Sequence, residues 1–425
     1  MRPAGWIWSC VGKADAELFR MTERMKTERA ICPSCGVEGP FELVFSAAAI
    51  PVHSCILIDS QSEAIDFPTG DLVLGLCHNC GVASNLRFDP GLIDYDTSYE
   101  ETQIHSATFG SYARTLAGEW FERYDLADAH VVEIGSGQGE FLQLMLDLGA
   151  NSATGIDPAC RPVDAAGMKL VNSEFSPELA DIGGDFLFCR HTLEHILQTG
   201  ELLAQIHAYL GPDSGVPVCF EVPDFNRVLD ECAFWDIYYE HCSYFTAESL
   251  AQLFRRHGFE VLDVRLVYGG QYLIIETKQA PADARSDQPE DNSRDPALLL
   301  DKARTFAART DEICAVWSKR ITAWRDAGKK IALWGSGSKA VGFMTGLGLG
   351  DEIIGVVDIN PAKQGKYMPG CMPKIMAPAE LVDIQPDVIV IMNPIYLEEI
   401  RTEVAGLDLT PEFVPLYTEE SIAHG

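Results

Sequence analysis

The sequence predicts an α/β protein in which a small β-rich module precedes two domains with doubly wound parallel sheets. Three observations support this fold class. Two cysteine pairs bracket short apolar runs near the N-terminus, strand and helix patterns alternate from about residue 104 onward, and the alternation starts again at Ile331 after a polar segment. Alternating strands and helices are typical of a parallel sheet covered on both faces.

Composition and charge limit the class of partner. Of the 425 residues, 47% are apolar and 22% charged, an ordinary globular mixture, and no apolar run approaches the roughly 18 residues of a membrane helix. A net charge of −31 repels phosphate backbones and anionic lipids. We therefore expect a small-molecule substrate and neither nucleic acid nor membrane as a partner, while the oligomeric state stays open.

Cysteine usage indicates the compartment. The 13 cysteines are an odd number, and residues 1–30 lack the apolar core and cleavage site of a secretory signal. These features favour reduced thiols and a cytoplasmic protein.

The chain is expected to divide into five segments. A stretch rich in Asp, Ser, Pro and Ala, residues 279–296, is the clearest linker, and a long helical pattern follows it up to Gly328. The predicted limits are a tail over 1–30, a β-rich module over 31–95, a first α/β domain over 96–279, a linker and long helix over 280–330, and a second α/β domain over 331–425.

The first α/β domain has a clear element order. Apolar residues spaced by three or four predict a helix over 104–125, and two β-rich runs around Gly269-Gly270 predict a hairpin at the sheet edge. The remaining predicted elements are the strands Val131–Ile134, Ala153–Ile156, Asp185–Cys189 and Pro217–Val222, and the helices Glu140–Leu148 and Leu193–Leu210.

The cysteine pairs predict a metal site. Each pair has the spacing C-x2-C followed by glycine, so each can form a tight knuckle that directs two thiolates at one ion. Four thiolates close a tetrahedral Zn²⁺ site with no open position, which indicates a structural role. Four unrelated buried thiols, or a redox pair, are the alternatives, and we expect no role for His53, Cys55 or His78 in the metal site. The predicted zinc ligands are Cys32, Cys35, Cys77 and Cys80.

The most informative stretch joins the strand at 131–134 to a helix through Gly135-x-Gly137-x-Gly139. Glycines permit a tight turn and close approach of a ligand, and the helix start offers unpaired amide groups. Asp157 ends the next strand, where a carboxylate can accept both hydroxyls of a ribose. A dinucleotide fits such a loop, and a turn without any ligand is a further alternative.

This loop resembles motif I of class I S-adenosylmethionine methyltransferases. The third glycine comes one residue earlier than in the dinucleotide pattern, and Glu133 precedes the loop. In that family the acid lies near the methionine amino group and the loop surrounds the methionine moiety. The resemblance implies S-adenosylmethionine as the cofactor, bound by Glu133, Gly135, Gly137, Gly139 and Asp157.

Residues 31–420 as a whole resemble the sugar C-methyltransferases of deoxysugar pathways and their relatives from bacterial surface-glycan clusters. The resemblance implies a zinc-binding N-terminal module, a central Rossmann-like methyltransferase domain and a second Rossmann-like domain at the C-terminus. It depends on the two cysteine pairs together with Tyr95–Tyr99, Glu133–Gly139, His191–His195, Tyr238–Phe245 and Val357–Gly365.

The same resemblance implies a reaction and its residues. Carbon-methylating members act on a keto-sugar nucleotide. A base of the enzyme removes the sugar proton next to the carbonyl, and the resulting enolate attacks the sulfonium methyl group. The implied catalytic residues are Tyr238, Glu240, His241 and His195, whose types suit proton transfer and stabilisation of an enolate oxygen. O- or N-methylation of a glycan or small molecule, a nicotinamide-dependent sugar-nucleotide oxidoreductase, and a zinc-ribbon adaptor without turnover are the alternatives.

A second strand, Gly-x-Gly loop and helix begins at Ile331, and Asp358 ends the following strand. This pattern alone could hold a nicotinamide cofactor, although the third glycine is missing at the expected place, where Val341 or Gly342 would have to serve. A sugar-nucleotide phosphate could use the same helix start, with Lys339 or Lys363 nearby. The family resemblance implies instead that this domain has no nicotinamide cofactor and helps to close the substrate cleft.

Overall fold

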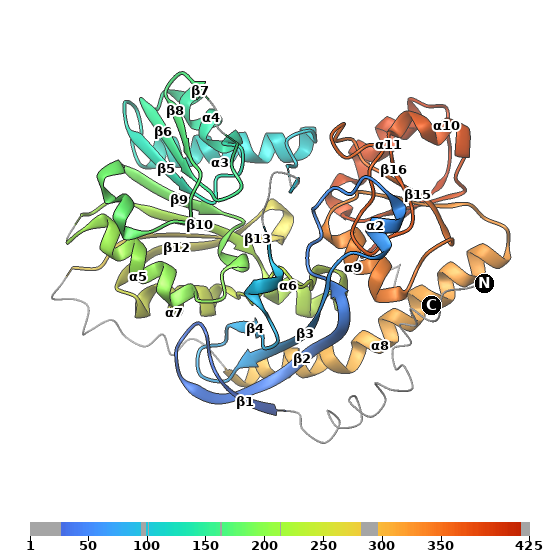
Figure 1. Ribbon diagram of the computed structural model, residues 1–425, viewed down its shortest axis with the longest axis horizontal. Helices are drawn as coiled ribbons and strands as arrows, with labels where there is room; N and C mark the ends of the chain where they lie inside the picture. The colour runs from blue at the N-terminus through green and yellow to red at the C-terminus, as the bar shows by residue number, and fades with distance from the viewer. Residues whose placement is uncertain are drawn as a thin grey trace.

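The computed structural model describes residues 27–94, 99–100, 102–161, 164–212, 214–281 and 296–417. Most of the predicted tail, part of the predicted linker and the first four residues of the expected Tyr95–Tyr99 motif lie outside these ranges. The described chain forms three sheets. Figure 1 shows the central and C-terminal sheets side by side, with the N-terminal sheet and the long helix α8 (Pro296–Asp326) below them.

The N-terminal sheet is antiparallel and has the strand order β1-β2-β3-β4-β11. Its last strand comes from the middle of the chain, because Ser243 pairs with Ser84 and Tyr244 with Ala83. The short helix α2 (Gln61–Ile65) lies between the second and third strands. The strands are β1 (Thr27–Ile31), β2 (Glu38–Pro51), β3 (Thr69–Cys77), β4 (Ala83–Asn85) and β11 (Ser243–Tyr244).

The central sheet has the order β12-β13-β10-β9-β5-β6-β8-β7, with a parallel middle and antiparallel pairs at both edges. The predicted strands and edge hairpin are confirmed. The strands are β5 (His130–Ile134), β6 (Ser152–Ile156), β7 (Asp164–Ala165), β8 (Met168–Val171), β9 (Phe186–Arg190), β10 (Val218–Pro223), β12 (Phe259–Val267) and β13 (Tyr272–Gln279).

The helices of the central part are α3 (Ala107–Arg123), α4 (Glu140–Leu148), α5 (Thr199–Leu210), α6 (Phe225–Asp230) and α7 (Ala247–Arg256). The prediction of one continuous helix over 193–210 is wrong at its start. Leu193–His195 forms a 3₁₀ turn, and α5 begins only at Thr199. The tertiary reason is that Cys242 Sγ and Ser243 Oγ bind the carbonyls of Glu194 and Ile196, which then do not extend a helix.

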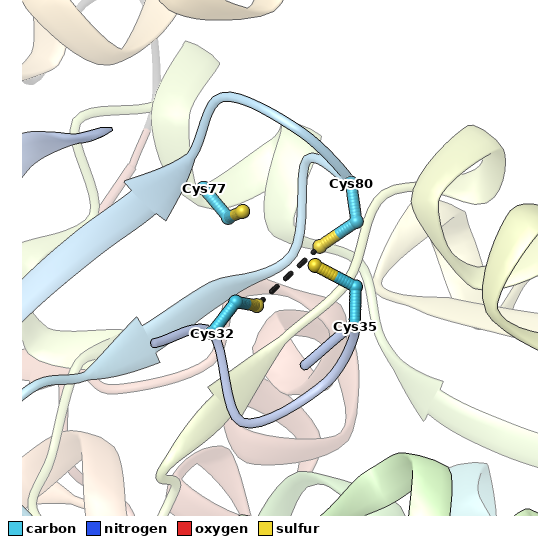
Figure 2. A group of neighbouring side chains, drawn as sticks. All are labelled: Cys32, Cys35, Cys77 and Cys80. Atoms are coloured by element: carbon cyan, nitrogen blue, oxygen red, sulfur yellow. Dashed lines mark hydrogen bonds between the residues drawn. The ribbon is translucent and has the colours of Figure 1, made fainter. Parts of the chain in front are cut away.

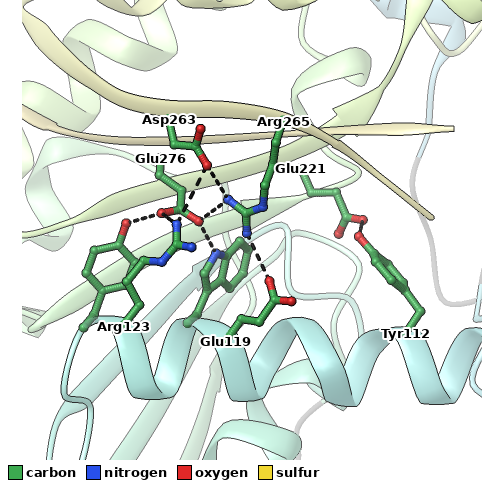
Figure 3. Close-up of polar contacts among 9 residues, drawn as sticks. Tyr112, Glu119, Arg123, Glu221, Asp263, Arg265 and Glu276 are labelled. Carbon is green, nitrogen blue, oxygen red and sulfur yellow. Dashed lines mark hydrogen bonds and ion pairs between the residues drawn. The ribbon is translucent and has the colours of Figure 1, made fainter. Parts of the chain in front are cut away.

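An ion network around the buried carboxylate of Glu276 links α3 to the sheet (Figure 3). The Glu276 carboxylate accepts hydrogen bonds from Trp120 Nε1 at 3.2 Å, from the Tyr124 hydroxyl and Arg123 Nη1 at 2.6 Å each, and from Arg265. Burial alone would raise the pKa of Glu276, but these hydrogen bonds hold it below its ordinary value. A buried carboxylate with this many donors has a structural role.

The C-terminal sheet is wholly parallel, in the order β16-β15-β14-β17-β18. Gly342 lies within helix α9, where its lack of a side chain serves packing. A Cβ at this position would lie 2.8 Å from the carbonyl oxygen of Trp235. Glycine therefore lets the helix pack closely against the 3₁₀ turn Phe234–Asp236. The elements are β14 (Ile331–Trp334), α9 (Ser338–Leu347), β15 (Ile353–Val357), β16 (Ile375–Met376), α10 (Leu381–Ile384), β17 (Val388–Ile391), α11 (Leu397–Ala405) and β18 (Glu412–Pro415).

The apolar cores cross the predicted domain limits, which stay a prediction. One core joins the N-terminal sheet, α6, α8 and the C-terminal sheet. In it, the rings of Phe45 and Phe306 pack edge to face with their centroids 6.3 Å apart. A second core joins the cysteine knuckles to α5, α7 and the central sheet. The N-terminal module is thus held between the two α/β units. Within the described part of the chain, no helix has the length and apolar character needed to cross a membrane.

Candidate active site

A cleft of about 1430 Å³ lies where the central and C-terminal sheets meet. Residues at the carboxyl ends of β5, β6 and β9 line one side, and residues that follow β14 and β15 line the other. Open parallel sheets bind ligands at this edge. Tyr99 and His105, which precede α3, also contribute to its wall. The cleft therefore has the position expected for a substrate and cofactor site.

The first glycine loop needs its glycines for backbone reasons. Gly135, Gly137 and Gly139 have φ values of +70°, +52° and +80°, in the left-handed region that favours glycine. A Cβ on Gly135 would lie 2.0 Å from Thr192 Oγ1. The loop lines the cleft and leads into α4, whose start coincides with the predicted helix.

Glu133, at the end of β5, is buried and lines the cleft. Its Oε2 has no hydrogen-bond partner among the described residues. Burial raises the pKa of Glu133 to about 8, although the charge of Arg190 opposes the shift. An unpaired buried carboxylate is costly, so this position is suited to a ligand that brings a positive charge.

Asp157 follows β6 and lines the cleft as predicted. Its Oδ2 accepts the Gly137 N–H at 2.9 Å, and its Oδ1 accepts the Ala159 N–H at 2.7 Å. Burial raises the pKa of Asp157, while these backbone hydrogen bonds oppose the shift. Each carboxylate oxygen retains a second lone pair, so the group can still accept hydrogen bonds from a diol.

Three of the four predicted catalytic side chains lie together in the cleft wall. The centroid of the His241 ring is 4.3 Å from the centroid of the Tyr238 ring and 4.6 Å from that of the His195 ring. Burial, with the nearby charge of His195, holds the pKa of His241 well below its ordinary value. A neutral imidazole beside a phenol can accept a proton or donate a hydrogen bond.

Glu240 lies apart from this group. Its carboxylate is buried outside the cleft wall and accepts hydrogen bonds from the Ser54 N–H at 3.0 Å, from the Ser54 hydroxyl, and from His53 Nδ1 at 3.2 Å. Because His53 Nε2 accepts the Asp94 N–H at 3.1 Å, Nδ1 carries the proton that is donated to Glu240. Burial would raise the pKa of Glu240, but the hydrogen bond from His53 lowers it overall.

The sequence interpretation missed the role of His53 and Ser54, because no spacing signal connects them with a glutamate nearly two hundred residues later. The Ser54 hydroxyl also lies 2.8 Å from that of Ser338, the first residue of α9. A two-residue segment of the N-terminal module therefore connects the loop before His241 with the C-terminal domain.

A second buried carboxylate cluster was also missed. Glu221, at the end of β10, accepts hydrogen bonds from the Tyr112 hydroxyl and from Arg190 Nε at 2.7 Å, and His191 Nε2 lies 3.5 Å from it. Burial opposes ionisation, but the charges of Arg190 and His191 hold the pKa of Glu221 at about 2. Next to this cluster, Glu194 is buried, lines the cleft and has an Oε2 without a hydrogen-bond partner in the described ranges.

The four predicted zinc ligands converge, as Figure 2 shows. Their Sγ atoms all lie within 4.8 Å of one another, and Cys32 Sγ is 3.6 Å from Cys80 Sγ. Gly36 and Gly81 have φ values of +70° and +73° and donate their N–H groups to the carbonyls of Cys32 and Cys77. This turn geometry directs each pair of thiols inward.

The second glycine loop lies on the opposite side of the cleft. Ser336 donates both its N–H and its hydroxyl to Asp358 Oδ2, at 3.0 and 2.6 Å. Lys339 forms an ion pair with Asp236, and Lys363 Nζ lies 4.0 Å from Asp358. Both lysines line the cleft, so cationic groups are present on the side remote from Glu133.

Comparisons with known proteins agree with this arrangement. A family model described as a methyltransferase domain matches residues 109–264, and a model described as a C-methyltransferase C-terminal domain matches residues 285–410. The chain is 29% identical over 397 residues to C-methyltransferase NovU of Streptomyces niveus, across 87% of this chain and 90% of that protein. This protein is an S-adenosylmethionine-dependent methyltransferase.

Solved methyltransferase structures resemble part of the enzyme. The 1,6-didemethyltoxoflavin-N1-methyltransferase of Burkholderia thailandensis is 20% identical, with a TM-score of 0.31 over 42% of this chain and 87% of its own. The magnesium protoporphyrin IX methyltransferase of Synechocystis is 12% identical, with a TM-score of 0.32 over 41% of this chain and 84% of its own. Identification as a methyltransferase decides against the nicotinamide-dependent oxidoreductase considered above.

Proposed function

We propose that this methyltransferase adds a methyl group to a carbon atom of a keto-sugar nucleotide or a related glycan precursor. The observation that carries the proposal is the packing of Tyr238, His195 and His241 into one wall of a cleft that also contains the first glycine loop. Simple transfer to an oxygen or an amine often needs one base, whereas carbon methylation needs proton removal together with stabilisation of an enolate oxygen. The C-terminal family model and the Streptomyces relative are both described as C-methyltransferases, which also favours carbon as the methylated atom.

The residues of the first loop fit S-adenosylmethionine, which supplies an electrophilic methyl group when bound. The amide groups of Gly135–Gly139 and of the start of α4 would hold its methionine end. Glu133 would face the positive charge of that end, which explains its unpaired buried oxygen. Asp157 would accept the ribose hydroxyls.

The cleft wall supplies the groups for the acceptor. One of Tyr238, His195 and His241 would take the proton from the carbon next to the carbonyl, and the bonding electron pair would move onto the carbonyl oxygen. Another would donate a hydrogen bond to that oxygen as its negative charge develops. The enolate carbon is then the nucleophile toward the methyl group. Losing one positioned acid or base typically costs about 10²–10⁴-fold in rate.

Glu240 has a positioning role in this scheme. It lies one residue before His241, and His53 and Ser54 hold its carboxylate outside the cleft. Its removal would take the acceptor from the buried Ser54 N–H, which typically costs about 1–3 kcal/mol. The loop that carries Tyr238 and His241 would then lose its fixed position.

The C-terminal side of the cleft is suited to the anionic part of the acceptor. On a chain with a net charge of −31, a diphosphate needs local cations, and Lys339 and Lys363 both line this side. A sugar nucleotide placed between them and the cleft wall would present its sugar to Tyr238, His195 and His241.

Zn²⁺ is the ion that the four cysteines would hold. Four thiolates without an open position fit a structural zinc site. The site lies at the end of β3, whose sheet continues through β4 to β11, and β11 begins two residues after His241. Elemental analysis should find tightly bound zinc that is lost in Cys77→Ser; its retention in that variant would contradict the assignment.

Methyl transfer with a ¹³C-methyl-labelled cofactor tests the proposal. The purified enzyme is incubated with a panel of keto-sugar nucleotides, and NMR identifies the atom that carries the new methyl group. We expect a C–CH₃ product, and exchange of the α-proton with heavy water when S-adenosylhomocysteine is bound. His241→Ala should lose both reactions while it still binds S-adenosylhomocysteine.

Two outcomes would contradict parts of the proposal. A new O–CH₃ or N–CH₃ bond in the product would remove the carbon assignment and favour the O- or N-methyltransferase alternative. Wild-type turnover in a variant that combines Glu240→Ala with His241→Ala would remove the catalytic assignment.

A further inference from the structure

A group of three metal-ligating side chains lies in the wall of the cleft, away from the four cysteines. One donor atom from each of Glu194, His195 and His241 lies within 4.8 Å of the other two. All three residues line the cleft. The 3₁₀ turn at Leu193–His195 follows β9, whereas His241 precedes β11, so the group forms only in the folded protein.

Two tertiary contacts hold these segments together. Cys242 Sγ lies 3.7 Å from the carbonyl oxygen of Glu194, and Ser243 Oγ donates to the carbonyl of Ile196 at 2.9 Å. Both contacts flank the three donor side chains, so the backbone positions are set before any ligand arrives. Preorganisation of this kind is what a metal site with side chains from distant segments requires.

One oxygen of the carboxylate in this group has no partner among the described protein atoms. Glu194 is 2% exposed, and its Oε2 has no hydrogen-bond donor among the described residues. Its Oε1, in contrast, forms an ion pair with His191 Nδ1 at 3.8 Å. Glu276, buried to the same degree, has four donor side chains. Glu194 therefore has an oxygen available for a cation, and Glu276 does not.

We propose that Glu194, His195 and His241 bind a divalent transition-metal ion that keeps an open coordination position toward the cleft. Two imidazole nitrogens and one carboxylate oxygen are a donor set typical of catalytic sites for Zn²⁺ and Fe²⁺. Ligand atoms bind such ions at about 2.0–2.2 Å, so small side-chain rotations would bring all three donors onto one ion. The site would differ from the four-cysteine site in the type of its donor atoms and in having a coordination position open to the cleft.

The role of this ion rests on the proposed function. An ion with an open position beside Tyr238 would bind the carbonyl oxygen of the acceptor and stabilise the enolate as a Lewis acid. His195 and His241 would then act through the ion, and Tyr238 would be the proton-handling side chain of the wall. Metal binding would thus separate stabilisation of the enolate oxygen, by the ion, from proton transfer, by Tyr238.

Cobalt titration of the full-length enzyme, with its cysteine-bound zinc retained, tests the site without substrate. Added Co²⁺ should bind with visible d–d absorption and without the thiolate-to-cobalt charge-transfer band that a cysteine site would show. Glu194→Gln should weaken Co²⁺ binding by more than the roughly 10–100-fold that loss of an outer-shell partner causes. The matched control is Glu201→Gln, which alters an exposed glutamate of the same cleft and should leave binding unchanged.

Folding is checked by S-adenosylhomocysteine binding, which both variants should retain. If Glu194→Gln does not fold, His195→Gln serves as the second variant, with the same expected loss of Co²⁺ binding. Absence of Co²⁺ binding in the wild-type enzyme, or equal Co²⁺ affinity in the folded Glu194→Gln and Glu201→Gln variants, would overturn the metal site. Because the titration contains no acceptor, it can succeed when the carbon methylation assay fails, and the two proposals can fail separately.

Discussion

The central and C-terminal sheets each contain a strand, a Gly-x-Gly loop and a helix, yet the two loops differ in the residues around them. Glu133 precedes the first loop and Leu333 holds the matching place before the second. Glu133 has an unpaired oxygen at the cleft, whereas Leu333 is buried in an apolar core. Asp157 accepts one N–H from its loop, but Asp358 accepts both an N–H and a hydroxyl from Ser336.

This difference shows that a glycine loop alone does not define a cofactor site. Both loops provide backbone amides at a helix start, which any anionic or polar group could use. Only the first combines them with an unsatisfied carboxylate that attracts a positively charged ligand. We therefore propose that S-adenosylmethionine binds at the first loop and that the acceptor binds on the side of the second.

The largest expected contrast comes from one alanine in each loop. Gly135→Ala places a Cβ 2.0 Å from Thr192 Oγ1 at a φ of +70°, so the loop must shift. Overpacking costs about 1–3 kcal/mol, and we expect the affinity for S-adenosylhomocysteine to fall by roughly 100-fold. Gly337→Ala is the control, because Gly337 has a φ of −86° and no atom within 4 Å of the added Cβ. Equal affinities in calorimetry would show that the first loop does not hold the cofactor.

A smaller effect should appear in the pH dependence of cofactor binding. The pKa of Glu133 is raised to about 8 by burial, so the free enzyme carries a proton there below that pH. A positively charged ligand favours the ionised form and displaces the proton. Affinity for S-adenosylhomocysteine should therefore rise with pH up to about 8, by at most about tenfold per unit, and then level off.

Glu133→Gln provides the control for that titration. Glutamine keeps the size of the side chain and cannot ionise, so the rise in affinity between about pH 6 and 8 should disappear. A pH profile unchanged in this variant would place the titrating group elsewhere.

The sequence predicted the regular parts of the central domain well, for identifiable reasons. The amphipathic pattern of Glu140–Leu148 and the glycine after it match α4, where Gly149 ends the helix with a φ of +117°. The apolar runs of β5, β6, β9 and β10 are fully buried in a parallel sheet, so their strand pattern is strong.

Features that depend on distant partners could not be predicted. The two residues of β11 are too few to give a pattern, and they form a strand only because β4 pairs with them. The contact of His53 with Glu240 joins segments with no common motif. Helical periodicity continued through Leu193, and only the bonds from Cys242 and Ser243 reveal the break that places His195 beside His241.

The most direct test of the difference between the two loops is a calorimetric titration of the wild-type enzyme with S-adenosylhomocysteine and, separately, with NADH. Because an unsatisfied buried carboxylate, that of Glu133, accompanies the first loop and not the second, we predict one S-adenosylhomocysteine per chain and no binding of NADH. Two S-adenosylhomocysteine molecules per chain, or tight binding of NADH, would contradict the assignment of the cofactor to the first loop alone.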